Sequence, residues 1–146
     1  HDLAEHDDGE EPIALCDVVW VPGRGRRALS PDGYGELDER PASSVAADVW
    51  ERWRSDPTAA PAGGEPLAKL GERVREACAD LLHDATGGVV VVVTHVSPIK
   101  AAVAWALAVP DDVAWRMYVE DASVTRIDVH STGPVLRWFN RLPPAP

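Results

Sequence analysis

Residues 89–107 read VVVVVTHVSPIKAAVAWAL, the strongest single pattern in this 146-residue chain. Five consecutive valines are typical of a strand that is covered on both faces, as in a parallel sheet. Pro98 favours the first turn of a helix, where its missing N–H costs no hydrogen bond, and we expect that helix to end near Val109. The pattern therefore predicts a strand, then His95, then a helix, with His95 at the carboxyl edge of the sheet, where α/β proteins bind ligands.

The segments on either side continue the alternation of helix and strand. Between Glu65 and His83, apolar residues recur every three or four positions, which is the period of a helix. Two β-prone runs, Ala122–Val129 and Val135–Phe139, come later and are joined by turn residues 131–134. The order helix, strand, helix, strand predicts an α/β protein. We expect a three-layer α/β/α sandwich with a mostly parallel sheet.

The start of the sequence contains two segments of opposite character. Residues 1–12 are acidic and nearly free of bulky apolar groups, so we expect a flexible terminus. Ile13–Val21 is apolar, β-prone and flanked by prolines, which predicts another buried strand. Further along, Ser43 or Ser44 is expected to cap a short helix. The predicted domain spans residues 13–146.

The charge balance narrows the classes of partner. The chain has 14 Lys and Arg residues against 24 Asp and Glu residues, a formal net charge of -10. A nucleic-acid-binding protein needs a broad basic surface, so we expect no nucleic-acid partner. The two cysteines, Cys16 and Cys78, form no C-x-x-C pair, which favours a reducing, cytoplasmic location. No apolar run reaches the length of a membrane span, so we expect no membrane association.

The predicted helix after His95 would create a site for an anion. The first N–H groups of a helix have no partner within the helix, and its dipole places partial positive charge there. The amides of Val96 and Ser97, the Ser97 hydroxyl and the His95 imidazole could all face one phosphate group. The alternative is a structural histidine bonded to a neighbouring carbonyl. Five tryptophans are expected to contribute packing rather than a substrate platform: Trp50, Trp53, Trp105, Trp115 and Trp138.

Residues 89–107 and two further segments resemble the histidine phosphatase (phosphoglycerate mutase-like) superfamily. Upstream, residues 50–74 read WERWRSDPTAAPAGGEPLAKLGERV, and downstream, residues 135–140 read VLRWFN. The resemblance covers about residues 48–142 and is closest to the acid-phosphatase-like members. It implies hydrolysis of a small phosphomonoester through a phosphohistidine, without a metal or other cofactor. By this resemblance, His95 is the second catalytic histidine, which binds the phosphoryl group and stabilises its developing charge.

The same resemblance assigns the remaining site residues. Residues 37–40, LDER, are similar to the motif that supplies the general acid, so Glu39 would protonate the leaving alcohol. The alternative for Glu39 is an exposed loop carboxylate. Arg27 matches a phosphate-binding arginine when Asp17–Trp20 is aligned with the strand that precedes it in the family. Apart from the resemblance, Arg24 belongs to a cluster of arginines in the same Gly-rich turn, and such a cluster could hold phosphate through its guanidinium groups or form a solvated basic turn.

The family's first motif, Arg-His-Gly, does not occur in these 146 residues. Its histidine is the nucleophile, and before residue 83 this chain has only His1 and His6. In a second alignment, Val18–Val21 corresponds to the family's first strand. The PGRG that follows then occupies the position of Arg-His-Gly, so this alignment contains no nucleophilic histidine. We therefore expect a fold that is truncated or degenerate at its N-terminus. A metal site in the acidic terminus is not expected, because a flexible segment offers no preorganised geometry.

Three functions stay open at this point. The first is a phosphomonoesterase. The second is a catalytically inactive module that binds a phospho-ligand or has a regulatory role, which the missing Arg-His-Gly favours. The third is a structural scaffold that self-associates, for example as a homodimer, through an uncovered sheet edge or apolar face.

Overall fold

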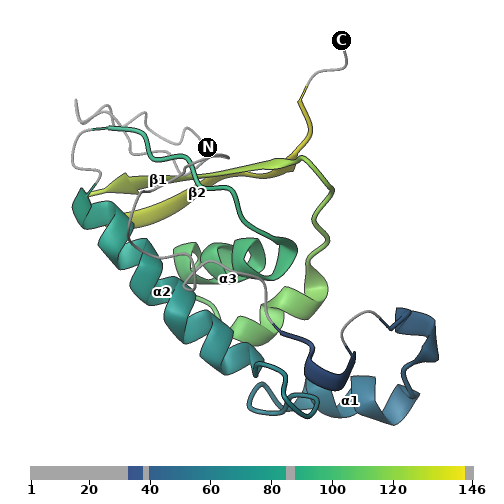
Figure 1. Ribbon diagram of the computed structural model, residues 1–146. Helices are drawn as coiled ribbons and strands as arrows, with labels where there is room; N and C mark the ends of the chain where they lie inside the picture. Colours follow the sequence, from purple (N-terminus) through teal and green to yellow (C-terminus); the bar gives the residue numbers. More distant parts are fainter. Residues whose placement is uncertain (1–32, 38–39, 85–87, 144–146) are drawn as a thin grey trace, which may run out of the picture.

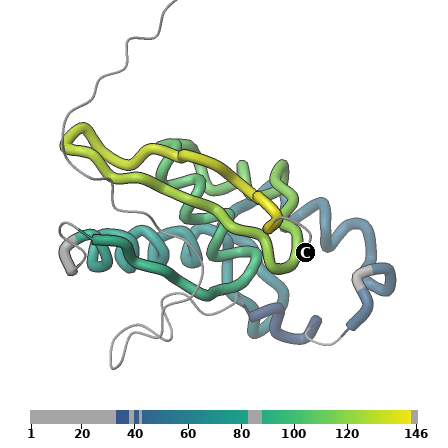
Figure 2. Tube along the Cα trace, turned by 90° about the horizontal axis from the view of Figure 1, so that it is seen from above, coloured from purple at the N-terminus to yellow at the C-terminus, as the bar shows by residue number. Residues whose placement is uncertain are grey.

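The computed structural model describes residues 33–37, 40–84 and 88–143 of the chain (Figure 1). The elements in order are the 3-10 helices η1 (Gly35–Leu37) and η2 (Ala42–Ser44), the helices α1 (Ala47–Ser55), α2 (Leu67–Asp84) and α3 (Val96–Ala106), the 3-10 helix η3 (Asp111–Arg116), and the strands β1 (Val124–His130) and β2 (Gly133–Arg141). Helix α3 contacts the sheet, α2 and η3, and it is therefore the central element of the described fold. Figures 1 and 2 show the two strands side by side as one layer next to these helices.

The core lies where α2 meets α3 and η3. On α2, the buried residues Leu67, Leu70, Val74 and Cys78 follow the three-and-four spacing of a helix, which confirms the predicted helix to within two residues at each end. They pack against Ala101 of α3 and a buried alanine of η3. Small residues on α3 allow its backbone to come close to α2, so the two helices form one compact unit.

Helix α3 begins at Val96, which places Pro98 in the first turn as predicted. It ends at Ala106, three residues before the predicted end, because Ala108 turns the chain with a φ of 52°. The N–H groups of Ala108 and Val109 donate to the carbonyls of Trp105 and Ala104, both at 3.1 Å. This is the Schellman arrangement of helix ends, with alanine where glycine is usual.

The two predicted strands after α3 are confirmed as an antiparallel hairpin. His130 pairs with Gly133, and Gly133 has a φ of 121°, a conformation that suits glycine at the tight turn. Asp128, fully buried on β1, accepts hydrogen bonds from Nε of Arg126 (2.5 Å) and Nε of Arg137 (2.6 Å). Burial alone would raise the pKa of Asp128, but these two bonds and the two positive charges outweigh it and lower the pKa below its usual value.

The run of valines that connects α2 to α3 departs from the prediction. Residues 89–93 include a single β-bridge, at Val90, and form no strand of the described sheet. Val89 and Val93 are 65% and 57% exposed, so the expectation of a strand covered on both faces is wrong for these two. A β-branched run supplies strand propensity, but a ladder also needs a neighbour. The other strand predicted in this half of the chain, Ile13–Val21, lies outside the described residues, as does the predicted flexible terminus 1–12.

The predicted serine cap of α1 is also wrong. Helix α1 begins after Ala46, whose side chain makes no cap hydrogen bond. Ser44 instead lies in η2, where its hydroxyl donates to the carbonyl of Pro41 at 2.7 Å. The Ser44 hydroxyl therefore makes a local hydrogen bond in the preceding turn instead of capping α1.

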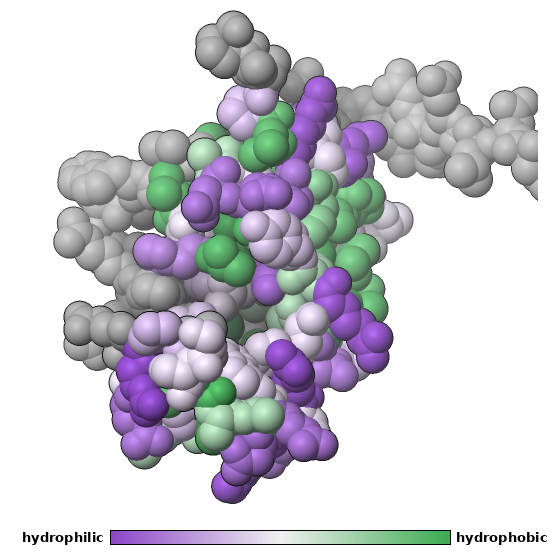
Figure 3. Space-filling view, turned by 90° about the vertical axis from the view of Figure 1, so that its right-hand side faces the viewer, coloured by the Kyte–Doolittle hydropathy of each residue, from purple (hydrophilic) through white to green (hydrophobic). Residues whose placement is uncertain are grey.

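None of the described helices is both long enough and apolar enough to cross a membrane. On the face shown in Figure 3, hydrophobic side chains are interspersed with hydrophilic ones and do not gather in one broad patch.

Candidate functional site

His95 is the N-cap residue of α3. Its backbone is extended (φ -122°, ψ 170°), and its carbonyl accepts the first helical hydrogen bond, from the N–H of Ile99 at 3.1 Å. The side chain is exposed and makes no cap hydrogen bond. The described residues provide no carbonyl partner for the imidazole, so the alternative of a structural histidine finds no support there. The side chain is thus placed at the positive end of the α3 dipole, as the sequence predicts.

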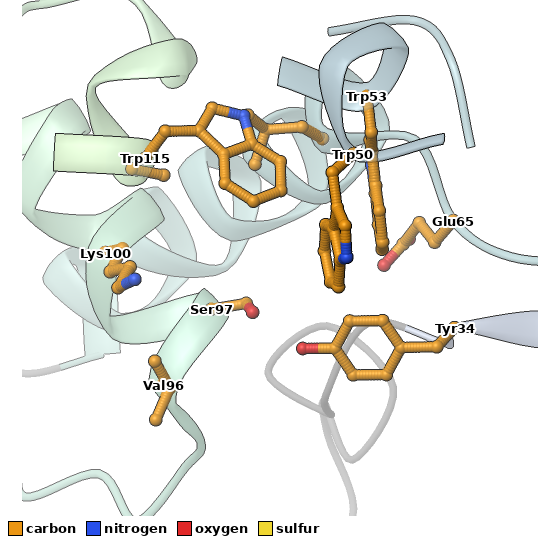
Figure 4. Close-up of a pocket in the computed structure, with 10 residues that line it drawn as sticks. Tyr34, Trp50, Trp53, Glu65, Val96, Ser97, Lys100 and Trp115 are labelled. Carbon is orange, nitrogen blue, oxygen red and sulfur yellow. The ribbon is translucent and has the colours of Figure 1, made fainter. Parts of the chain in front are cut away.

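The first residues of α3 form one wall of a cavity of about 180 Å³. The residues that line it come from α1, α3, η3 and the segments around residues 34 and 65, and they are Tyr34, Trp50, Trp53, Glu65, Leu67, Val96, Ser97, Lys100, Ala114 and Trp115. Figure 4 shows the Ser97 hydroxyl on the α3 side pointing towards the opposite wall, and the Tyr34 hydroxyl pointing back towards α3. The helix start that was predicted to bind an anion therefore opens onto a defined cavity.

The wall that faces α3 is aromatic. The rings of Trp50 and Trp53 are stacked, with centroids 5.7 Å apart and an interplanar angle of 11°. Tyr34 and Trp115 meet Trp53 edge-on, with centroids at 5.6 and 5.7 Å. Trp53 is only 4% exposed, and its Nε1 has no hydrogen-bond partner among the described residues. Trp53 is thus a packing residue, as predicted, that holds three less buried rings around the cavity.

Tyr34 is held in this wall by a contact between two loops. Tyr34 and Gly64 form an antiparallel β-bridge. On either side of it, the N–H of Glu36 donates to the carbonyl of Ala62 (2.9 Å), and the N–H of Glu65 donates to the carbonyl of Gly33 (2.8 Å). Gly35 lies in the contact with a φ of 57°, and a Cβ there would lie 2.2 Å from the carbonyl oxygen of Ala62. This position therefore requires glycine.

The charges on the cavity wall favour an anion at the α3 end. The Glu65 carboxylate accepts two hydrogen bonds from the Arg73 guanidinium, at 2.8 and 2.7 Å, so its negative charge is compensated. Lys100 lines the cavity one turn after Ser97. Together with the free N–H groups at the start of α3, Lys100 gives this end of the cavity a positive field.

The predicted site residues are placed only in part. His95, Val96 and Ser97 come together at the start of α3 as expected, whereas Glu39, Arg24 and Arg27 lie outside the described residues. The sequence did not predict that Lys100 and the aromatic rings line one cavity. The spacing of Trp50 and Trp53 could have indicated the wall, because residues three apart share one face of a helix. Across the described ranges, no group of three or more His, Cys, Asp or Glu residues is placed to hold a metal ion.

Comparison with known proteins identifies the family. Residues 27–142 match the family described as the histidine phosphatase superfamily (branch 1). The chain belongs to this superfamily. A curated relative, a bifunctional protein of Mycobacterium tuberculosis, is 30% identical over 86 residues, which make up 59% of this chain and 24% of that protein. The chain thus spans about a quarter of the length of the curated relatives that it matches.

Solved structures of histidine phosphatases share the fold of this chain. The phosphoserine phosphatase of Entamoeba histolytica, as a variant bound to phosphoserine, superposes with a TM-score of 0.70 at 17% identity, over 78% of this chain and 59% of that one. A mycobacterial glucosyl-3-phosphoglycerate phosphatase in complex with VO3 gives 0.68 at 25% identity, over 78% and 62%. The α-ribazole phosphatase of Shigella flexneri gives 0.63 at 19% identity, over 82% and 62%. The predicted α/β, phosphoglycerate mutase-like fold is confirmed.

Proposed function

We propose that this chain is a phosphomonoesterase that acts on a small phosphate ester, with the phosphoryl group held at the start of α3. The observation that supports this most is the position of His95. It caps α3, and the next two residues, Val96 and Ser97, line the cavity. A histidine, two free backbone amides and a hydroxyl at one helix N-terminus form a suitable set of donors for phosphate oxygens.

In the proposed mechanism, each group has one task. A histidine nitrogen attacks phosphorus, the bond from phosphorus to the ester oxygen breaks, and Glu39 gives a proton to the departing alkoxide. Water then cleaves the phosphohistidine and releases inorganic phosphate. His95 stabilises the negative charge on the phosphoryl oxygens during both steps, and Arg27 and Arg24 are proposed to bind the same oxygens. The nucleophile is to be sought first at His1 and His6.

The test is turnover of para-nitrophenyl phosphate between about pH 5 and 8 by the wild type, His95→Ala and His130→Ala. His130 is a matched control, because it is the other histidine with a described side chain and it ends β1, away from the cavity lining. We expect His95→Ala to lower kcat by about 100-fold or more, the usual effect of removing a donor that stabilises the transition state. Equal turnover by the wild type and His95→Ala would contradict the proposal.

A second candidate is a catalytically inactive module that binds a phospho-ligand. The missing Arg-His-Gly in these 146 residues favours it, because a phosphoryl site can survive without its nucleophile. In that case no protein hydrolyses the ester, while inorganic phosphate or vanadate still raises the Tm of the wild type and not of His95→Ala. Turnover that depends on His95 would exclude this candidate.

A further inference from the structure

The cavity beside His95 has two ends of different chemistry. At one end, the start of α3 presents Ser97 and Lys100. At the other end, Tyr34, Trp50 and Trp115 surround the buried ring of Trp53 (Figure 4). A phosphate ester has the same division, with a charged phosphoryl group at one end and the leaving alcohol at the other.

We propose that the aromatic end is a subsite for the leaving group, and that the preferred substrates are phosphate esters of alcohols with a single aromatic ring. This inference rests on the proposed function, because it takes the phosphoryl group to lie at the start of α3.

The size of the cavity limits the leaving group to one ring at most. An apolar cavity of about 150 Å³ holds one benzene molecule, and this cavity has about 180 Å³, part of which the phosphoryl group would occupy. A disaccharide or a nucleotide would exceed that volume. A short alkyl alcohol would leave most of the aromatic wall without a contact.

The aromatic wall has exposed ring surface that a ligand could contact. Trp53 is buried, but Tyr34 and Trp115 are 40% and 36% exposed, and Trp50 is partly buried. Exposed rings beside a cavity gain contacts when an aromatic ligand enters, through stacking and edge-to-face packing. The stacked and edge-on contacts with Trp53 fix the directions of the other rings, so little side-chain entropy is lost on binding.

The polar groups of the wall argue against a charged or sugar-like leaving group. Glu65 is already paired with Arg73, and Lys100, the one cation among the described lining residues, belongs to the α3 end. A second phosphate or a carboxylate on the leaving group would therefore lie against rings with no matching charge. A sugar has more hydroxyl groups than the three rings have polar atoms, which are the hydroxyl of Tyr34 and the indole N–H groups of Trp50 and Trp115.

The experiment compares ligands that differ only in the ring. Affinities of phenylphosphonate and methylphosphonate, neither of which can be hydrolysed, are measured by calorimetry or by competition with vanadate. Values of kcat/KM are measured in parallel for benzyl phosphate and ethyl phosphate. The proteins are the wild type, Trp50→Ala, Trp50→Phe and, as a control outside the cavity, Trp138→Ala, which removes a ring that stacks with Arg126 and Arg141.

We expect the wild type to prefer phenylphosphonate by about tenfold or more, from ring contact and burial together. Trp50→Ala should reduce this preference to about threefold or less, while Trp50→Phe and Trp138→Ala keep most of it. Equal affinities of the wild type for the two phosphonates would overturn the leaving-group subsite and leave the phosphoryl site standing. Failure to bind either phosphonate, together with no turnover of either ester, would overturn the proposed function and the subsite with it.

Discussion

Two cavities lie on opposite faces of α3 and differ in almost every property. The first, described above, has about 180 Å³ and is lined by Val96, Ser97 and Lys100 from α3. The second has about 60 Å³ and is lined on α3 by Pro98, Ile99 and Ala102. Successive residues of a helix are 100° apart, so these two sets of three point in opposite directions.

The walls across from α3 account for the difference. The larger cavity faces aromatic rings and a compensated carboxylate. The smaller one faces mainly aliphatic and small side chains of α2, residues 92–94 and β1, among them Cys78, Thr125 and Ile127. The same short stretch of α3 therefore lines the cavity proposed to bind a ligand on one face and a small, mainly apolar cavity on the other. The pattern of a helix gives the two faces, but the chemistry of each cavity is set by what packs against it.

The Cys78 thiol in the smaller cavity is not suited to act as a nucleophile at neutral pH. Burial raises the pKa of Cys78 from its usual 9.0 to about 12. At neutral pH the side chain is a neutral thiol, whereas a nucleophilic cysteine must be a thiolate. Cys78 is therefore a packing residue of α2 and not a substitute for the missing nucleophilic histidine.

Among these substitutions, the largest loss of stability is expected at Gly35, and of the two cavities only the aromatic one should change. Gly35→Ala places a Cβ against the carbonyl of Ala62 in a left-handed backbone conformation, so the two loops must separate. We expect a loss of about 3 kcal/mol in the free energy of unfolding, from strain and broken loop contacts, and a weaker preference for phenylphosphonate because Tyr34 moves. Urea unfolding and calorimetry measure the two effects.

Gly33→Ala is the matched control for this change. A Cβ at Gly33 meets nothing within 4 Å, so its stability and ligand preference should stay close to those of the wild type. If Gly33→Ala and Gly35→Ala behaved alike, the loop contact would not be what positions Tyr34.

A smaller loss of stability, which occurs only at alkaline pH, is expected from Cys78 in the smaller cavity. The folded thiol of Cys78 keeps its proton up to about pH 12, whereas the unfolded thiol loses it near 9.0. The unfolded state therefore releases its proton first as the pH rises, and the stability from this thiol, complete below pH 9, falls by about 1.4 kcal/mol per pH unit above it. Urea unfolding at pH 8 and pH 10 should show a steeper loss in Cys16→Ser than in Cys16→Ser with Cys78→Ala.

Equal losses in these two proteins would mean that the Cys78 thiol is not shielded from water. Phenylphosphonate affinity serves as the control, because Cys78 does not line the aromatic cavity. We expect that affinity to be unchanged by Cys78→Ala.

The sequence was most informative where a pattern depends on nearby residues. The spacing of Leu67, Leu70 and Val74 predicted α2, and Pro98 predicted the start of α3, because helix geometry is set within a few residues. The two strands after α3 were predicted for the same reason, from β-prone runs on either side of turn residues 131–134, whereas their antiparallel pairing is a finding of the structure. The position of His95 followed from the predicted start of α3.

The sequence was less informative where the outcome depends on distant partners. The valine run before His95 predicted a covered strand, but its cover must come from another part of the chain. Local spacing could indicate that Trp50 and Trp53 share one face of a helix, but Tyr34 and Trp115 are far from them in sequence, so no local pattern could indicate that these two rings complete the aromatic wall. The assignments of Glu39 and Arg27 come from resemblance alone and stay predictions.

The central claim, that a phosphoryl group binds at His95, can be tested directly by NMR of the protein with 15N-labelled histidine. The wild type is titrated with inorganic phosphate and then with vanadate, and the imidazole signals of His95 and His130 are assigned with the two alanine variants. We expect the His95 signals to shift and saturate while those of His130 stay in place, whether or not the protein hydrolyses esters. Saturable binding that leaves the His95 signals unmoved would contradict the claim.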